Sequence, residues 1–169
     1  MNIQRYSLIW RSLHWLSAVV ILWAIASGFY LALFDVSDAT HHWIADTNVA
    51  TTLVFIPFFT LRMLIAWHSE KPETKNLSPQ QQQLAHRGHQ LIYLAVICVL
   101  ISGVLMMERP MPFFGIAEFP ALLEKGNLTQ FFFWFHRCSN IALTLLVLAH
   151  LAAVVKHQLA GVPVLRKMV

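Results

Sequence analysis

Four apolar stretches, each long enough to cross a lipid bilayer, constrain this chain more than any other feature. They cover approximately residues 8–33, 49–67, 89–107 and 131–155. A hydrocarbon core is crossed by about 20 apolar residues in a helix, and only helices and closed barrels satisfy their backbone hydrogen bonds there. Barrel strands would read as alternating segments of about ten residues, which the sequence lacks. It therefore predicts an all-α integral membrane protein, a four-helix bundle formed by a single domain over residues 1–169.

The composition excludes a soluble enzyme with its own core. Of the 169 residues, 57% are hydrophobic and 12% are charged, whereas about 25% of the residues of a soluble domain are charged. Too few polar side chains therefore remain to cover a surface in water. An HExxH zinc pair, a CxxCH haem-attachment site and a cysteine cluster are all missing. A zinc protease, a c-type haem and an iron–sulfur centre are thus without support.

Lysine and arginine gather on one side of the predicted spans. Both chain ends and the loop over residues 68–88 are basic, whereas the connection over residues 34–48 carries three aspartates and no Lys or Arg. Short cytoplasmic loops are enriched in Lys and Arg, so we expect both termini and the 68–88 loop to face the cytoplasm. The net charge of +4 then reflects topology. Membrane lipid is the expected partner, and nucleic acid is not.

Two connections carry local signals. Ser78 is expected to cap the third helix, with Pro79 at the first helical position. The third connection, over residues 108–130, is long and contains three prolines and two glycines. We expect turns there, with a short interfacial helix over residues 120–125 as one option.

Nine histidines are unusual in so apolar a chain, and two of them give the strongest signal. His136 and His150 are 14 residues apart in the last span, a rise of about 21 Å that falls within about 40° of whole helical turns. Both therefore lie on one face, one towards each side of the membrane. Ionisable residues at membrane depth are costly and usually face the bundle interior. The pair is interpreted either as two axial haem ligands or as neutral histidines hydrogen-bonded to neighbouring helices.

His14 lies early in the first span, at the depth expected for His150. Two imidazoles from different helices at one depth can clamp a single haem iron in a low-spin form. Arg11 lies one turn before His14. It is interpreted either as a partner for a haem propionate or as a basic anchor at the membrane interface.

Two further histidines have open roles. His89 lies at the start of the third span, near the expected cytoplasmic side. It is a candidate axial ligand, a hydrogen-bond donor to a ligand or a proton-handling group at a quinone pocket, and the alternative is an interfacial histidine without function. His42 follows His41 in the connection before the second span. Adjacent residues point about 100° apart on a helix, so at most one of these two faces a buried haem, and a solvated role is favoured.

These residues together resemble the bacterial cytochrome b561 family, over nearly the whole chain. The matching segments are Arg5-Tyr6-Ser7, Leu13-His14-Trp15-Leu16, Leu84-Ala85-His86-Arg87-Gly88-His89, Tyr93-Leu94, Ser102-Gly103, Phe114-Gly115 and Trp134-Phe135-His136 with His150. The resemblance implies a single transmembrane cytochrome b domain, multi-pass in the bacterial inner membrane, that exchanges electrons with ubiquinone or another quinone. It also implies one or two haem b groups, and one branch of the family oxidises superoxide.

The resemblance implies roles for individual histidines as well. His14 and His150 match the ligands of the haem on the cytoplasmic side, and His89 matches a histidine close to it. His136 matches one ligand of a second haem on the opposite side.

One position departs from the family pattern. The second ligand of that other haem is a family histidine 14 residues before an arginine, and counting back from Arg62 gives Asn48. Three arrangements remain open: an empty site, a five-coordinate haem on His136 with an open position for a small molecule, or replacement of the ligand by His42 through a distorted helix start. We expect loss or altered ligation of this haem, and a single haem cannot bridge both faces of the membrane.

Three functions follow from the sequence and the resemblance. The first is a membrane haem b protein that passes electrons between a donor and quinone, with a superoxide:quinone oxidoreductase as its enzymatic form. The second is a cytochrome b anchor subunit for a redox partner protein, either a dehydrogenase or a c-type cytochrome. The third is a non-haem membrane scaffold, which would be colourless and would tolerate loss of His14 and His150. No catalytic residue is assigned.

Overall fold

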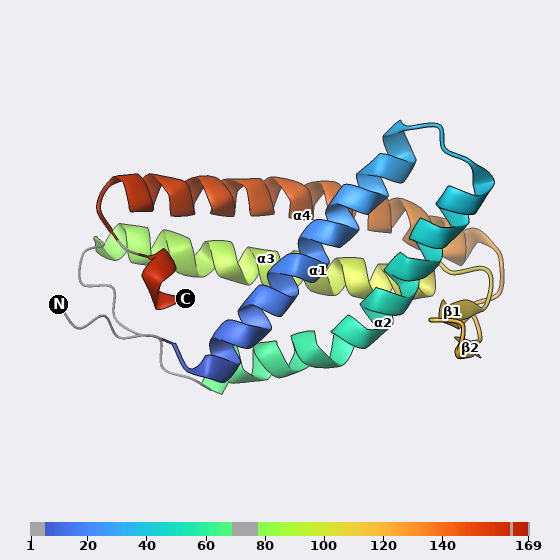
Figure 1. Cartoon of the computed structure of the whole chain (residues 1–169), viewed down its shortest axis with the longest axis horizontal. Coiled ribbons are helices and arrows are strands. Elements are labelled where there is room, and N and C mark those ends of the chain that lie inside the picture. The colour runs from blue at the N-terminus through green and yellow to red at the C-terminus, as the bar shows by residue number, and fades with distance from the viewer. Residues whose placement is uncertain (1–5, 69–77, 163, 169) are drawn as a thin grey trace.

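The computed structural model describes residues 6–68, 78–162 and 164–168, and most of them are helical (Figure 1). The long helices are α1 (Leu8–Leu33), α2 (Asp38–His68), α3 (Pro79–Leu105) and α4 (Asn127–Leu159). Two short strands, β1 (Met111–Phe113) and β2 (Ala117–Phe119), lie between α3 and α4, and a 3-10 helix, η1 (Leu165–Lys167), follows α4. All four long helices are apolar enough to span a membrane. The predicted four-helix, all-α membrane protein is confirmed.

Three helices extend beyond the apolar stretches that predicted them. Helix α1 has the predicted bounds, but α2 and α3 begin at Asp38 and Pro79, about three turns before the predicted spans. Hydropathy marks the part of a helix that lipid surrounds, whereas the hydrogen-bond ladder continues until a cap ends it. At α3 that cap is Ser78, whose side chain accepts from the Gln81 N–H while the Gln81 side chain accepts from the Ser78 N–H. The predicted cap with Pro79 in the first turn is confirmed.

The loop between α3 and α4 forms an antiparallel hairpin. Phe113 pairs with Ala117, and the turn between them places Phe114 and Gly115 at φ values of 50° and 71°. Two successive positive φ values are typical of the tight turns that match strand twist. The short helix considered over residues 120–125 is wrong, because that segment consists of bends and irregular backbone.

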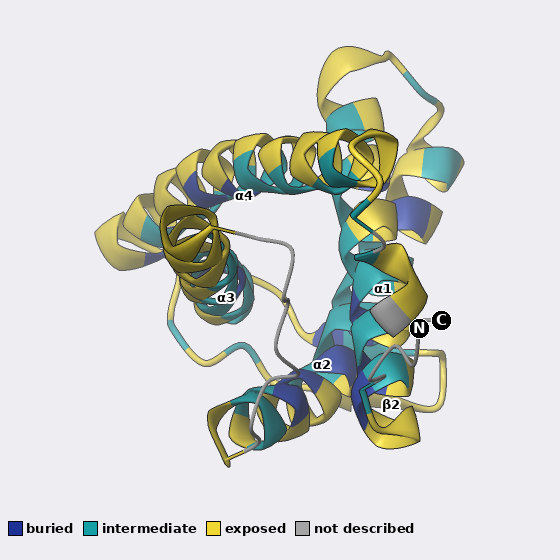
Figure 2. Cartoon of the chain, turned by 90° about the vertical axis from the view of Figure 1, so that its left-hand side faces the viewer, coloured by how far each residue is buried: buried dark blue, intermediate teal, exposed yellow. Residues whose placement is uncertain are grey.

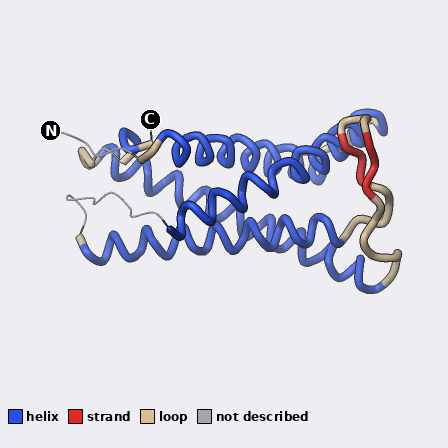
Figure 3. The backbone as a smooth tube through the Cα atoms, turned by 90° about the horizontal axis from the view of Figure 1, so that it is seen from below, coloured by secondary structure: helices blue, strands red, loops and turns tan. Residues whose placement is uncertain are grey.

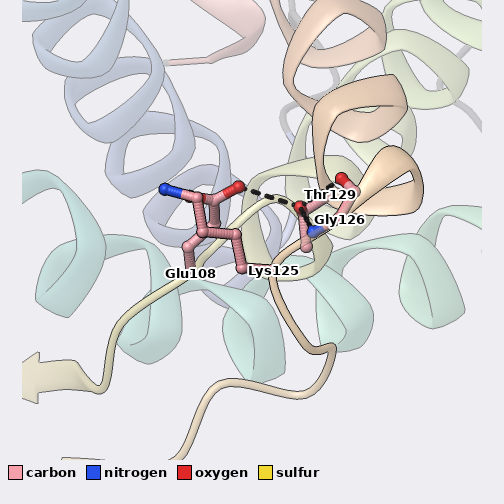
Figure 4. Close-up of polar contacts among 4 residues, drawn as sticks. All are labelled: Glu108, Lys125, Gly126 and Thr129. Atoms are coloured by element: carbon pink, nitrogen blue, oxygen red, sulfur yellow. Dashed lines mark hydrogen bonds and ion pairs between the residues drawn. The ribbon is translucent and has the colours of Figure 1, made fainter.

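Glu108 connects the end of α3 to the beginning of α4 (Figure 4). Its carboxylate accepts a hydrogen bond of 2.9 Å from the Thr129 hydroxyl and pairs with the Lys125 ammonium at 3.1 Å. These two contacts, the Thr129 hydrogen bond first, hold the pKa of Glu108 below its usual range. The Gly126 N–H donates to the Thr129 hydroxyl oxygen at 3.0 Å, so the start of α4 is held to the loop.

The helices pack as two pairs, α1 with α2 and α3 with α4, and fewer contacts join α2 to α3. The start of α1 and the end of α4 lie at one end of the bundle, with the hairpin at the other (Figure 3). A small buried core joins the pairs, and Phe55, Phe59, Val96 and Leu143 form it. Most of the outer helix surface is exposed (Figure 2), and the many large apolar side chains on it suit contact with lipid.

Candidate functional site

Polar residues recur on all four helices at one spacing, and they define two layers across the bundle. On each helix the two residues are 13 or 14 positions apart, which is a rise of about 20 Å. The first layer consists of His14, Arg62, His89 and His150, from α1 to α4 in order. The second layer consists of Ser27, Asn48, Ser102 and His136, in the same helix order.

The first layer links the helices within each pair and across the pairs. The Arg62 guanidinium contacts Nδ1 of His14 at 3.1 Å, which joins α1 to α2. The rings of His89 and His150 meet edge to face with centroids 5.2 Å apart, which joins α3 to α4. The Arg62 guanidinium also lies over the ring of Tyr93, one turn after His89 on α3, which links the two helix pairs. The structure thus brings three predicted site histidines together at one depth.

Arg62 is the most deeply buried charged group of this layer, with 8% of its surface exposed. Its guanidinium carbon lies 5.3 Å from the centre of the Tyr93 ring. Its Nε has no hydrogen-bond partner within the described residues, and the same is true of the buried Nε of Arg11. In the sequence, Arg62 served only as the position from which Asn48 was counted. An arginine in the apolar part of a span is nevertheless itself a signal of function.

The second layer repeats this pairing with different chemistry. Ser27 donates to the Asn48 side-chain oxygen at 2.9 Å, which joins α1 to α2. Nδ1 of His136 lies 3.1 Å from the Val99 carbonyl and 3.1 Å from the Ser102 hydroxyl, which joins α4 to α3. A carbonyl only accepts, so Nδ1 of His136 carries the proton and Nε2 has a free lone pair. The serines had no predicted role, and their spacing from His14 and His89 is the signal that identifies them.

The remaining predicted residues lie at the edges of this arrangement. Arg11 is half-buried one turn before His14. His42 is exposed, and its ring lies against that of His41. Helix α2 is continuous from Asp38, so His42 is about 9 Å beyond Asn48 along a regular helix. The distorted helix start that would carry His42 into the second layer is not seen.

Comparison with known proteins decides the family. The family described as prokaryotic cytochrome b561 matches residues 5–169. This chain belongs to that family. Cytochrome b561 homolog 2 of Escherichia coli (strain K12) is similar to it, with 26% identity over 130 residues that cover 73% of this chain and 68% of that protein. The chain is therefore a multi-pass membrane protein that binds haem b and transfers electrons, as the resemblance implied.

The donor set of this cytochrome b561 suits a haem better than a bare metal ion. The described residues contain no group of three or more His, Cys, Asp or Glu side chains that could hold a metal ion. A haem supplies four ring nitrogens of its own and needs only axial ligands from the protein. The imidazoles of the two layers can serve as such ligands. The unpartnered, buried guanidinium nitrogens of Arg11 and Arg62 suit the carboxylates that a haem carries.

Gly103 leaves the space that the His136 ring occupies. A Cβ at this position would lie 3.1 Å from Cε1 of His136. We expect Gly103→Val to displace the ring and to remove any haem that His136 holds, so its haem content and spin state should match those of His136→Ala, with no further change when the two are combined. Gly28→Val is the matched control, because a Cβ at Gly28 meets nothing within 4 Å. A larger loss in Gly103→Val than in His136→Ala would contradict the prediction.

Proposed function

We propose that this cytochrome b561 passes electrons between a donor and ubiquinone, or another quinone, in the bacterial inner membrane, through a haem b bound by His14 and His150. The observation that carries the proposal is the first layer, in which two half-buried imidazoles come from different helix pairs: His14 contacts Arg62, Arg62 lies over the Tyr93 ring one turn from His89, and His89 lies against His150. An iron between two imidazoles is six-coordinate and low-spin, which suits electron transfer.

Haem b supplies reversible one-electron chemistry when bound, and the residues of the chain set the conditions for it. The Phe55, Phe59, Val96 and Leu143 core lies between the two layers along α2, α3 and α4, so it separates them with apolar side chains. Nδ1 of His89 donates to the Ala85 carbonyl at 2.7 Å, which leaves Nε2 of His89 as an acceptor. We propose that His89 orients His150 or receives a proton near the quinone.

The second layer supports a narrower function than transfer across the whole membrane. It has one imidazole, His136, and the opposite helix pair offers the Ser27–Asn48 hydrogen bond instead of a second. We propose that the second haem is lost or bound by His136 alone. Superoxide oxidation is the enzymatic form of this proposal. Superoxide is an anion, and the negative charges of the exposed Asp35 and Asp38 do not favour its approach.

The haem-to-protein ratio of the detergent-purified protein tests this function. We expect a ratio near one by pyridine haemochrome, a low-spin spectrum, and oxidation of the dithionite-reduced haem by decyl-ubiquinone in stopped flow. A ratio near two with a wholly low-spin spectrum would contradict the altered second layer and favour transfer across the membrane, whereas a ratio near two with a high-spin component would mean that His136 binds the second haem alone. A reduced haem that decyl-ubiquinone leaves unchanged would overturn the quinone role and favour an anchor subunit. A colourless protein would overturn the haem proposal.

A further inference from the structure

Arg62 is a buried cation without a countercharge. It is 8% exposed, and the ion pairs of the described residues join Arg109 to Asp46 and Lys125 to Glu108 but do not include it. Its neighbours are the His14 ring and the Tyr93 ring, neither of which is an anion. A buried charge that lacks a partner is strongly unfavourable. A chain that places one at membrane depth is expected to receive an anion there.

The contact with His14 fixes the proton on the imidazole. A guanidinium only donates hydrogen bonds, so Nδ1 of His14 accepts at 3.1 Å. The proton of neutral His14 is then on Nε2. His136 is arranged the other way round, because its Nδ1 donates to the Val99 carbonyl. Ligating histidines almost always donate the other ring N–H to an acceptor, so His136 is already in that state and His14 is not.

Arg62 needs a countercharge, and His14 needs its proton on Nδ1 in order to bind iron. Both requirements are satisfied if Arg62 changes partner. A His14 that binds iron through Nε2 carries its proton on Nδ1, which can no longer accept from Arg62. The guanidinium then loses its side-chain acceptor on α1 and keeps the neutral Tyr93 side chain as a hydrogen-bond partner, so a buried cation without a countercharge remains. A haem bound at His14 carries two propionate carboxylates, which are strong acceptors for a guanidinium. Tyr93 holds the guanidinium in this layer by contact with its ring.

We propose that Arg62 exchanges His14 for a haem propionate when this cytochrome takes up its cofactor, and that it thereby selects the anionic form of haem. This inference rests on the proposed haem site at His14. The guanidinium then serves as the countercharge of the bound haem. Arg11, whose buried Nε also has no partner within the described residues, is placed one turn from His14 to serve the second propionate.

Haem b and its dimethyl ester, in which both propionates are neutral, test the exchange. Each is titrated into the full-length, haem-free protein in detergent, and binding is followed by the absorption of the bound haem. We expect the unmodified protein to bind haem b more tightly than the ester, by about 10- to 100-fold, because hydrogen bonds between charged groups contribute more than neutral ones. Arg62→Gln should bind both with similar affinity. Arg62→Lys keeps the charge and should retain part of the preference.

Arg109→Gln is the matched control, because Arg109 pairs with Asp46 at the hairpin end of the bundle and should keep the full preference. Equal affinity of the unmodified protein for the two haems would overturn the exchange and leave the haem site in place. An Arg62→Gln variant with the full preference would overturn it as well. If Arg62→Gln does not fold, Arg62→Lys decides the question. An Arg62→Lys variant that keeps the full preference for haem b, and whose propionate bending mode in resonance Raman spectra matches that of the unmodified protein, would overturn the exchange. Failure of the unmodified protein to bind either haem would instead overturn the proposed function.

Discussion

His14→Ala and His150→Ala are each expected to abolish the low-spin haem b spectrum of the purified protein. The two imidazoles belong to different helix pairs of the first layer, His14 beside Arg62 and His150 beside His89, so neither can take the place of the other. An iron that loses one axial imidazole becomes five-coordinate and high-spin or leaves the protein. The absorption bands of the reduced protein and its electron paramagnetic resonance spectrum measure the change.

His68→Ala is the control for this pair of variants. His68 is an exposed histidine at the end of α2, where its ring contacts the Leu64 carbonyl of its own helix. We expect its spectrum to match that of the unmodified protein. An unchanged low-spin spectrum in both His14→Ala and His150→Ala would exclude them as ligands, and a colourless but folded His68→Ala would show that haem loss does not report on ligation.

Asn48→His is expected to increase the haem content from near one to near two per chain, or to convert a high-spin signal to a low-spin one. Asn48 lies in the second layer with His136 and belongs to the opposite helix pair. An imidazole there would supply the second ligand that the layer lacks. Pyridine haemochrome analysis gives the content, and electron paramagnetic resonance gives the spin state.

Thr47→His provides the matched comparison, because its side chain points about 100° away from that of Asn48 on the same helix. It should leave haem content and spin state unchanged. An equal gain in Thr47→His would mean that any added histidine near the start of α2 recruits haem. An Asn48→His variant identical to the unmodified protein would mean that another group already completes the second layer.

Local sequence signals predicted the elements of this fold well. A run of about 20 apolar residues is a property of the segment itself, so the four spans could be recognised without knowledge of their neighbours. The Ser78 cap is equally local, because its partner Gln81 is three residues away. Turns were expected in the third connection, but the pairing of β1 with β2 was not predicted, because strands of three residues are too short to show an alternating pattern.

The sequence by itself determined that the chain forms membrane-spanning helices and that His136 and His150 share one face of the last of them. Both follow from hydropathy and the helical repeat, which act within one segment. Only the tertiary structure decided that His14 meets Arg62, that Ser27 meets Asn48 and that His136 meets Ser102. The physical reason is that these contacts depend on which helices pair and how each is rotated about its axis. Packing between distant segments sets both.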